Sequence, residues 1–235
     1  MKEEKPIVQN STEMYHPSPE VLAQANVKDP DAIRKEAAKD IQAYWATRAE
    51  ELDWYKKWDK VLDDSNKPFY KWFTGGKTNI VLNALDRHVK TWRRNKLALI
   101  WESEKGEVRT FSYHAINREV CKFANVLKSM GVVKGDLVTI YMPRIPETII
   151  AMLATAKIGA VHSVVYGGFS VEALHGRIED SGSKVVITAD GGNMNGKKIE
   201  LKKIVDEALQ RSGAPEHVVV VKHLGIDVMM EQGRD

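Results

Sequence analysis

The feature that most constrains the fold is a regular alternation of short β-branched runs with helical segments, which starts at Leu97. The runs predict strands at 97–101, 108–111, 137–142, 161–165, 184–188 and 217–222. The segments between them predict helices from 112 to about 130, then at 146–158, 171–180 and 201–211. Strands that alternate with helices of about ten residues are typical of βαβ units. The sequence therefore predicts an α/β fold, with a parallel sheet flanked by helices.

Capping residues mark the expected helix boundaries. Ser112 and Ser170 stand at two helix starts, where a hydroxyl oxygen can accept a hydrogen bond from a free N–H group. Gly131 and Gly159 stand at two helix ends. The first of these helices carries apolar residues at alternating steps of four and three: Ile116, Val120, Phe123, Leu127 and Met130. This spacing predicts one buried stripe.

The N-terminal residues lack this alternation and divide into two parts. Residues 1–28 are polar, contain prolines and show no sustained period, so a flexible arm is predicted. Asp29, Pro30 and Asp31 predict a helix that begins near Ala32. Residues 29–95 are then interpreted as a helical, aromatic-rich extension, and 96–235 as a partial α/β domain. The aromatic residues are Tyr44, Trp45, Trp54, Tyr55, Trp58, Phe69, Tyr70, Trp72 and Phe73; packing is favoured over a ligand cage.

Composition argues against several classes of partner. The formal net charge of +3 is too small to attract a polyanion by itself, so nucleic acid is not an expected partner. The basic run around Trp92 is interpreted as a solvated face, with a phosphate contact as the weaker alternative. Its members are Lys90, Arg93, Arg94 and Lys96.

Metal sites, disulfides and membrane spans are not predicted either. Cys121 is the one cysteine, which excludes an internal disulfide, and the histidines lack metal-ligand spacing. No run approaches the roughly 18 apolar residues that a membrane-spanning helix needs. The charged N-terminus does not resemble a secretory signal. These features predict a cytoplasmic protein without a metal site.

Candidate ligand loops follow three of the predicted strands, at the carboxyl ends where parallel sheets bind ligands. At 143–146 two prolines are expected to fix a helix entry, with Arg144 as a less favoured anion ligand. Residues 166–170 read YGGFS, for which tight packing and ligand contact are equally supported. Residues 190–198 are glycine-rich with adjacent lysines, and suit a phosphate or a flexible surface turn equally well. Residues 166–170 lack both the GxGxxG fingerprint and the lysine of a Walker loop.

A series of segments makes the chain similar to one family. The segments lie at 71–79, 85–88, 133–136, 140–147 and 157–170. In this order, and over about residues 43–209, the chain resembles the AMP-forming acetyl-CoA synthetases of the adenylate-forming superfamily. The YGGFS loop, which resembles that family's FGGFS, separates this subfamily from relatives that activate fatty acids or amino acids.

The resemblance implies a ligase reaction in two steps. A carboxylate and ATP give an acyl-adenylate and pyrophosphate, and the thiol of CoA then displaces AMP. The family's phosphate loop, acyl pocket, adenine and magnesium ligands and catalytic lysine are expected beyond Asp235. We therefore assign no catalytic residue and no metal ligand here. The chain is expected to be an incomplete N-terminal domain of the adenylate-forming fold, truncated and inactive when isolated.

The resemblance also assigns part of a CoA site. Tyr166 and Gly168, with Gly167 between them, are expected near the nucleotide portion of CoA. The 3′-phosphate is expected near Met194, Asn195, Gly196 and Lys197. The family usually has arginine where Met194 stands, so the two-pronged guanidinium contact is lost and Lys197 offers only a point charge. This departure leaves CoA affinity and the acyl acceptor open.

Two alternatives come from other classes of protein. One is a non-catalytic module that binds CoA or a nucleotide. The other is an interaction subunit of a split ligase, in which the remainder of the synthetase is a separate chain. ATP and CoA are the substrates that the resemblance implies, with magnesium in the full enzyme.

Overall fold

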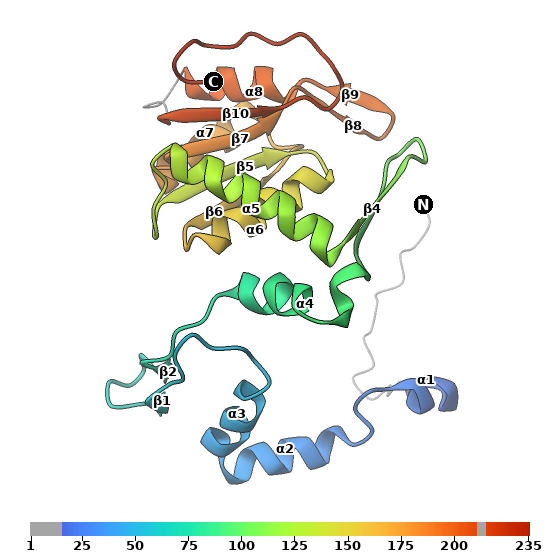
Figure 1. Cartoon of the computed structure of the whole chain (residues 1–235), viewed down its shortest axis with the longest axis vertical. Coiled ribbons are helices and arrows are strands. Elements are labelled where there is room, and N and C mark those ends of the chain that lie inside the picture. Colours follow the sequence, from blue (N-terminus) through green and yellow to red (C-terminus); the bar gives the residue numbers. More distant parts are fainter. Residues whose placement is uncertain (1–15, 211–214) are drawn as a thin grey trace, which may run out of the picture. The chain divides into compact units, whose positions relative to one another are not determined.

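The computed structural model describes residues 16–210 and 215–235. The chain divides into two compact units. One comprises residues up to Glu51 together with Lys60–Thr74, and the other comprises Leu52–Asp59 with Gly75–Asp235. Figure 1 shows the helices and strands of both.

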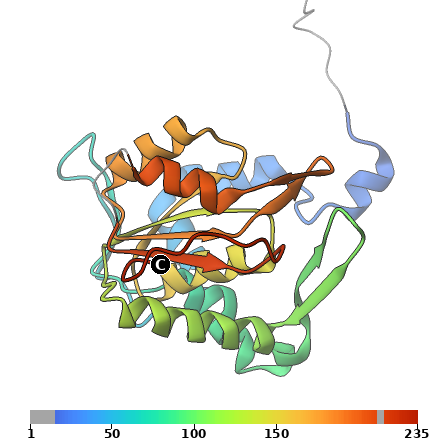
Figure 2. The ribbon, with the colours of Figure 1, turned by 90° about the horizontal axis from the view of Figure 1, so that it is seen from above.

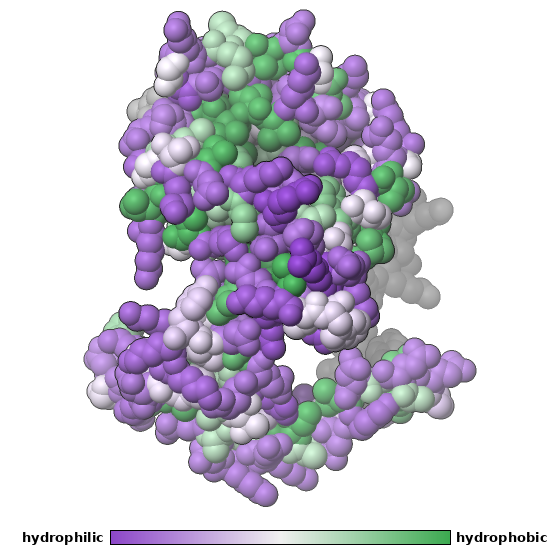
Figure 3. All heavy atoms as spheres, in the orientation of Figure 1, coloured by the Kyte–Doolittle hydropathy of each residue, from purple (hydrophilic) through white to green (hydrophobic). Residues whose placement is uncertain are grey.

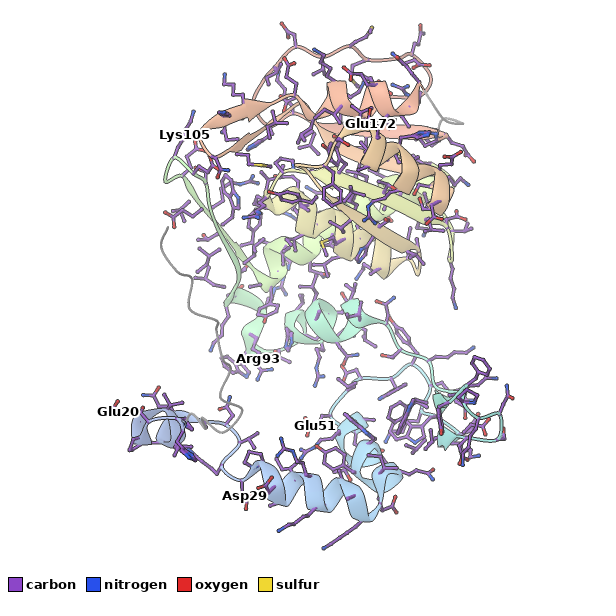
Figure 4. The ribbon with its side chains drawn as sticks, turned by 180° about the vertical axis from the view of Figure 1, so that it is seen from behind. Glu20, Asp29, Glu51, Arg93, Lys105 and Glu172 are labelled. Carbon is purple, nitrogen blue, oxygen red and sulfur yellow. The ribbon has the colours of Figure 1, made fainter. Side chains whose placement is uncertain are left out.

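The first unit combines short helices with an antiparallel hairpin. Its elements are α1 (Pro19–Gln24), α2 (Pro30–Lys39), α3 (Ile41–Ala49), β1 (Lys60–Asp63) and β2 (Lys71–Thr74). Helix α2 begins where the sequence predicts a helix, because Asp29 (Figure 4) accepts hydrogen bonds from the N–H groups of Asp31 and Ala32 at 3.1 and 2.9 Å. Of the predicted flexible arm, residues 1–15 lie outside the described residues, and Pro19–Gln24 is helical.

The β1–β2 hairpin corrects the expectation of a purely helical extension. Leu62 pairs with Trp72 across the hairpin, and the Thr74 hydroxyl donates to the Lys60 carbonyl at 3.3 Å. The rings of Trp45 on α3 and Trp72 on β2 meet edge to face, with centroids 6.4 Å apart. An aromatic-rich segment without helical period can thus form strands when cross-strand and helix contacts stabilise them.

The second unit is built on a parallel sheet with the strand order β10-β7-β5-β6. The strands are β5 (Leu137–Met142), β6 (Val161–Tyr166), β7 (Val185–Ala189) and β10 (His217–Val221). Helices α5 (Tyr113–Ser129), α6 (Pro146–Lys157), α7 (Val171–Ser181) and α8 (Leu201–Leu209) connect and cover them. Figure 2 shows the sheet between helix layers. The predicted α/β fold with a parallel sheet flanked by helices is confirmed.

Each face of the sheet has its own hydrophobic core. Along β5, Val138 and Ile140 enter the core beneath α5 and α6, whereas Tyr141 enters the core beneath α7 and α8. This alternation follows from the pleat, which points successive side chains to opposite faces. The predicted stripe on α5 packs into the first core: Ile116, Val120 and Leu127 are buried, and Phe123 and Met130 are partly buried.

The predicted serine caps are formed at the starts of α5 and α7. The Ser112 hydroxyl accepts a hydrogen bond from the Ala115 N–H at 3.2 Å at the start of α5. The Ser170 hydroxyl accepts from the Ala173 N–H at 3.3 Å at the start of α7. Each bond satisfies a donor that the first helical turn leaves free.

Smaller elements complete the second unit. They are a π-helical turn (Leu82–Asp86), α4 (Arg87–Val89), a 3₁₀ turn (Trp92–Asn95), and the antiparallel hairpins β3 (Leu97–Glu102) with β4 (Val108–Ser112) and β8 (Gly192–Met194) with β9 (Lys197–Ile199). The loop expected at 190–198 is a hairpin, with its turn at Asn195 and Gly196.

An apolar groove lies between α5, α6 and the sheet. It has a volume of about 380 Å³, and its lining includes Phe123, Val126, Ile150, Ile187 and Val221. Figure 3 shows hydrophobic residues gathered on this face, between α5 and β10. Within residues 16–210 and 215–235, helices are too short or too polar to cross a membrane.

Candidate functional site

A cavity of about 310 Å³ opens at the carboxyl ends of β5 and β6. It lies between the end of the sheet and the β3–β4 and β8–β9 hairpins, and its volume is near the lower end of the usual range for ligand pockets. Of the predicted site residues, Tyr166, Gly167, Met194 and Asn195 line it. Gly168, Gly196 and Lys197 are exposed and do not line it. The cavity thus brings together part of each predicted loop.

Residues 166–170, here called the first glycine loop, are anchored from beneath by a tyrosine. Tyr141 on β5 is fully buried, and its hydroxyl donates to the carbonyls of Gly167 at 3.2 Å and Phe169 at 2.9 Å. Burial raises the pKa of Tyr141 to about 12, so the hydroxyl stays a donor at neutral pH. A Cβ atom at Gly167 would lie 3.2 Å from the Met142 carbonyl oxygen. Backbone packing therefore accounts for this glycine.

Residues 190–198, here called the second glycine loop, are anchored by a buried carboxylate. The side chain of Asp190 accepts backbone hydrogen bonds at 2.6–3.1 Å from its own neighbour and from the segment after β10. The donors are Gly191, His223, Leu224, Gly225 and Ile226. Burial alone would raise the pKa of Asp190, but these N–H groups hold it below its ordinary value. The carboxylate therefore stays charged and fixes the entry to the loop.

Close packing also explains the glycine pair of the second loop. A Cβ atom at Gly191 would lie 2.7 Å from the Ile199 carbonyl oxygen. A Cβ atom at Gly192 would lie 2.6 Å from Cβ of Pro143, in the loop after β5. Both distances are too short for a side chain, so the pair allows β8 to approach its neighbours.

The two glycine loops meet at the cavity. The Tyr166 hydroxyl lies 3.6 Å from Sδ of Met194, within the range of a weak hydrogen bond to sulfur. Tyr166 keeps 48% of its surface exposed, so its ring can still meet a ligand. Loops that lie 28 residues apart in the chain therefore form one surface.

Arg144 supplies a cation at the same cavity. Its guanidinium carbon lies 6.0 Å from the centre of the Tyr166 ring, which is within the range of a cation–π contact. Trp101 on β3 donates from its indole N–H to the Arg144 carbonyl at 2.7 Å and also lines the cavity. From the sequence, Arg144 is a less favoured anion ligand. Trp101 cannot be selected from the sequence, because an aromatic residue in a strand carries no ligand-binding pattern.

His223 is another cavity residue that the sequence did not single out. It lines the cavity, and its ring lies edge to face with Trp101 at a centroid distance of 6.5 Å. It reaches this position because Asp190 binds the His223 N–H. The sequence does hold one signal for this position. Asp190 is an acid directly after a strand, and a glycine-containing turn at Gly225 follows a later strand, so the acid could bind the N–H groups of that turn.

The turn of the second glycine loop faces a carboxylate from another hairpin. The N–H groups of Asn195 and Gly196 donate to the two carboxylate oxygens of Glu104, at 2.9 and 3.1 Å. Glu104 follows β3, and it lines the cavity together with Met194 and Asn195. The backbone N–H groups expected near a phosphate are therefore bound to a side chain of the protein itself.

The part of the chain that the structure describes holds no candidate metal site. No group of three or more His, Cys, Asp or Glu residues lies close enough there to hold an ion. Cys121 lies half-buried on α5, with its Sγ 3.9 Å from the Asn117 amide oxygen.

Comparison with known proteins identifies the family. The model for AMP-binding enzymes matches residues 85–234, which is more than half of the chain, and the model for the acetyl-coenzyme A synthetase N-terminus matches residues 31–84. The chain belongs to the AMP-binding enzyme family. The resemblance inferred from the sequence motifs is thereby confirmed.

Relatives of this chain include named synthetases. An acetyl-coenzyme A synthetase of Rubrobacter xylanophilus is 49% identical over 100% of this chain and 36% of the relative. One of Deinococcus radiodurans is 49% identical over 96% of this chain and 35% of the relative. The known structure of an acetoacetyl-CoA synthetase from Streptomyces lividans matches with a TM-score of 0.80 and 25% identity, over 91% of this chain and 33% of that protein.

The chain spans about a third of the length of these relatives. It corresponds to their N-terminal part, because the N-terminus model covers its first matched segment and the AMP-binding model follows. The assignment of Tyr166, Gly167, Gly168, Met194, Asn195, Gly196 and Lys197 to a coenzyme site stays a prediction.

Proposed function

We propose that this chain is the N-terminal part of an AMP-forming acetyl-CoA synthetase and that its cavity forms part of the CoA site. The observation that carries the proposal is the contact between Tyr166 and Met194, which joins the two glycine loops into one cavity. The family match and the relatives named acetyl-coenzyme A synthetase supply the reaction class.

The proposed reaction has two steps. An acetate oxygen attacks the α-phosphorus of ATP, so that acetyl-adenylate forms and pyrophosphate leaves. The CoA thiol then attacks the acyl carbonyl carbon, so that the thioester forms and AMP leaves. Such steps depend on positioning and on stabilisation of phosphate charge. Residues that contact ATP, magnesium and the acyl group are proposed to lie in the length of the relatives that this chain does not span.

This chain's own contribution is proposed to be binding and orientation. Arg144 offers a guanidinium beside the cavity, and the half-exposed ring of Tyr166 offers a flat apolar face. A guanidinium suits phosphate oxygens, and an aromatic face suits a nucleobase. Met194 offers no charge, so the phosphate contact depends on Arg144, Lys197 and backbone N–H groups.

A binding experiment tests this assignment. Calorimetry with CoA should give a measurable Kd for the chain, and Arg144→Gln should weaken CoA binding about tenfold, as expected for the loss of one charged hydrogen bond. Arg118→Gln is the matched control, because Arg118 lies on α5, pairs with Glu119 at 3.1 Å and lines the apolar groove instead. Unchanged CoA affinity in Arg144→Gln, or equal losses in both variants, would contradict the assignment.

An activity experiment separates the synthetase from a non-catalytic module. The chain alone should not form acetyl-adenylate from acetate and ATP. Addition of the remaining length of a relative as a second chain should restore the activity and yield a complex that survives gel filtration. The apolar groove between α5 and β10 supports such a partner, because it offers uncovered hydrophobic surface beside an edge strand. CoA binding with no activity under these conditions would favour the module.

The cytoplasmic location expected from the N-terminal sequence also remains a proposal. Cell fractionation with an antibody against this chain would test it.

A further inference from the structure

The turn between β8 and β9 presents consecutive backbone N–H groups at the rim of the cavity. Asn195 and Gly196 both have positive φ angles, +51° and +74°, and both are exposed. Consecutive N–H groups in such a turn point the same way and form a small concave site for an anion. The turn is therefore built to receive negatively charged oxygen atoms.

An anion of the protein already fills this site. Glu104 lies at the tip of the β3–β4 hairpin, next to Lys105, which is labelled in Figure 4. Its Oε1 accepts from the Asn195 N–H at 2.9 Å, and its Oε2 accepts from the Gly196 N–H at 3.1 Å. Figure 1 shows the tips of the two hairpins side by side. Each carboxylate oxygen thus takes one of the two donors.

The hairpin tip has a fixed local geometry. The Ser103 hydroxyl oxygen accepts hydrogen bonds from the N–H groups of Lys105 at 3.2 Å and Glu107 at 3.0 Å. This turn holds Glu104 toward the β8–β9 hairpin. Because Glu104 and its two partners are exposed, water competes for the same hydrogen bonds and the contact is worth little energy. A stronger anion can therefore displace the side chain.

We propose that Glu104 is a built-in competitor for the anion site at Asn195 and Gly196, and that it lowers the affinity of the cavity for phosphate-bearing ligands. A phosphate oxygen and the Glu104 carboxylate cannot accept from the same two N–H groups at once. A bound phosphate must push Glu104 aside and also meets its negative charge. Met194 brings no cation to offset this repulsion, so a phosphate binds here more weakly than it would without Glu104.

Removal of the charge tests the competition directly. Glu104→Gln keeps the size of the side chain and removes the negative charge. Glu107→Gln is the matched control, because it makes the same change at an exposed position of the same hairpin, where the backbone N–H and not the carboxylate supports the turn. Inorganic phosphate is titrated into each ¹⁵N-labelled protein while the amide resonances of Asn195 and Gly196 are followed.

The expected result is phosphate binding that is about three- to tenfold tighter in Glu104→Gln than in the wild type, with Glu107→Gln equal to the wild type. Phosphate binding in Glu104→Gln that is equal to or weaker than in the wild type would show that Glu104 only links the two hairpins and does not compete with the anion. Phosphate that shifts neither amide in any of the proteins would show that the turn is no anion site. Either result overturns the proposal.

A second titration connects the site to the coenzyme. That the natural ligand is CoA rests on the proposed function, whereas the competition at the turn does not. Glu104→Gln should bind CoA more tightly and leave the affinity for 3′-dephospho-CoA unchanged. An equal effect on both coenzymes would overturn a role for Glu104 against the 3′-phosphate. If no protein binds CoA while phosphate behaves as expected, the proposed function fails and the competition stands.

Discussion

The two glycine loops share a glycine pair but are held in opposite ways. The first glycine loop is anchored by a donor, the neutral hydroxyl of Tyr141, which binds two of its carbonyls. The second is anchored by an acceptor, the charged carboxylate of Asp190, which binds backbone N–H groups. In both, glycines allow another part of the backbone or a proline ring to come close. A glycine pair therefore indicates close approach but not what approaches.

The largest expected effect comes from the charged anchor. Asp190→Asn keeps the shape of the side chain but turns an amide NH₂ toward backbone N–H groups that need an acceptor. We expect a loss of about 3–4 kcal/mol in the free energy of unfolding, because hydrogen bonds to a charged group are lost and buried donors are left unpaired. Urea denaturation followed by circular dichroism measures it. A loss below about 1 kcal/mol would contradict the anchoring role.

Acid should act on the same anchor. The pKa of Asp190 is lower in the folded chain than in the unfolded chain, so its stabilisation is present above about pH 4 and is lost as the pH falls through the folded pKa. Asp235, whose pKa is lowered to about 2, also contributes to acid sensitivity. The stability difference between wild type and Asp190→Asn isolates Asp190, and it should narrow from pH 7 to pH 3. A constant difference would contradict the expected titration.

Close packing of the second loop predicts the next effect. Gly192→Ala places a methyl group 2.6 Å from Cβ of Pro143, whose ring cannot rotate away. We expect a loss of about 2–3 kcal/mol from overpacking. Gly176→Ala is the control, because Gly176 lies on α7 with open space around its Cβ position. There alanine should stabilise the helix by about 0.5–1 kcal/mol. Thermal melts of both variants should therefore shift in opposite directions.

The neutral anchor of the first loop predicts a smaller change. Tyr141→Phe removes a hydroxyl that serves the Gly167 and Phe169 carbonyls, at a cost of about 1–2 kcal/mol. Tyr166→Phe removes a hydroxyl that contacts only the Met194 sulfur among the described hydrogen bonds, and should change stability by less than about 0.5 kcal/mol. Denaturation curves measure both variants. Equal losses of unfolding free energy in Tyr141→Phe and Tyr166→Phe would contradict the anchoring role of Tyr141.

The smallest expected effect concerns ligand binding rather than stability. Under the proposed function, Met194→Arg adds a guanidinium beside Asn195 and should tighten CoA binding about three- to fivefold, relative to 3′-dephospho-CoA. Met194→Leu is the matched apolar control and should leave the ratio of the two affinities unchanged. Fluorescence or calorimetric titration with CoA and 3′-dephospho-CoA measures this ratio. An equal change in both affinities would contradict a phosphate contact at position 194.

Local patterns predicted most of the α/β unit. The strand 137–142 and the helix starts at Ser112 and Ser170 were correct because period and capping act over a few residues. The β1–β2 and β8–β9 hairpins were missed. Trp72 forms a strand because it pairs with Leu62 and meets the ring of Trp45, and neither contact is visible as a period in the sequence.

The cavity also combines residues that local patterns predict with residues that they do not. Its glycine loops were predicted from their residues, but Trp101, Glu104 and His223 were not, because each arrives from a distant segment. Glu104 meets Asn195 across 91 residues of sequence, and Asp190 meets His223 across 33. Such contacts depend on strand order and on hairpin direction, which short patterns do not encode.

By itself, the sequence determined most of the strands and helices of the α/β unit, where two of its helices begin, and which family the chain resembles. The tertiary structure decided which loops share a cavity, which carboxylate anchors the second glycine loop and which one fills its turn. The physical reason is the range of the forces: side-chain periodicity and caps act within a few residues, whereas hydrogen bonds between loops form only after the sheet has brought them together.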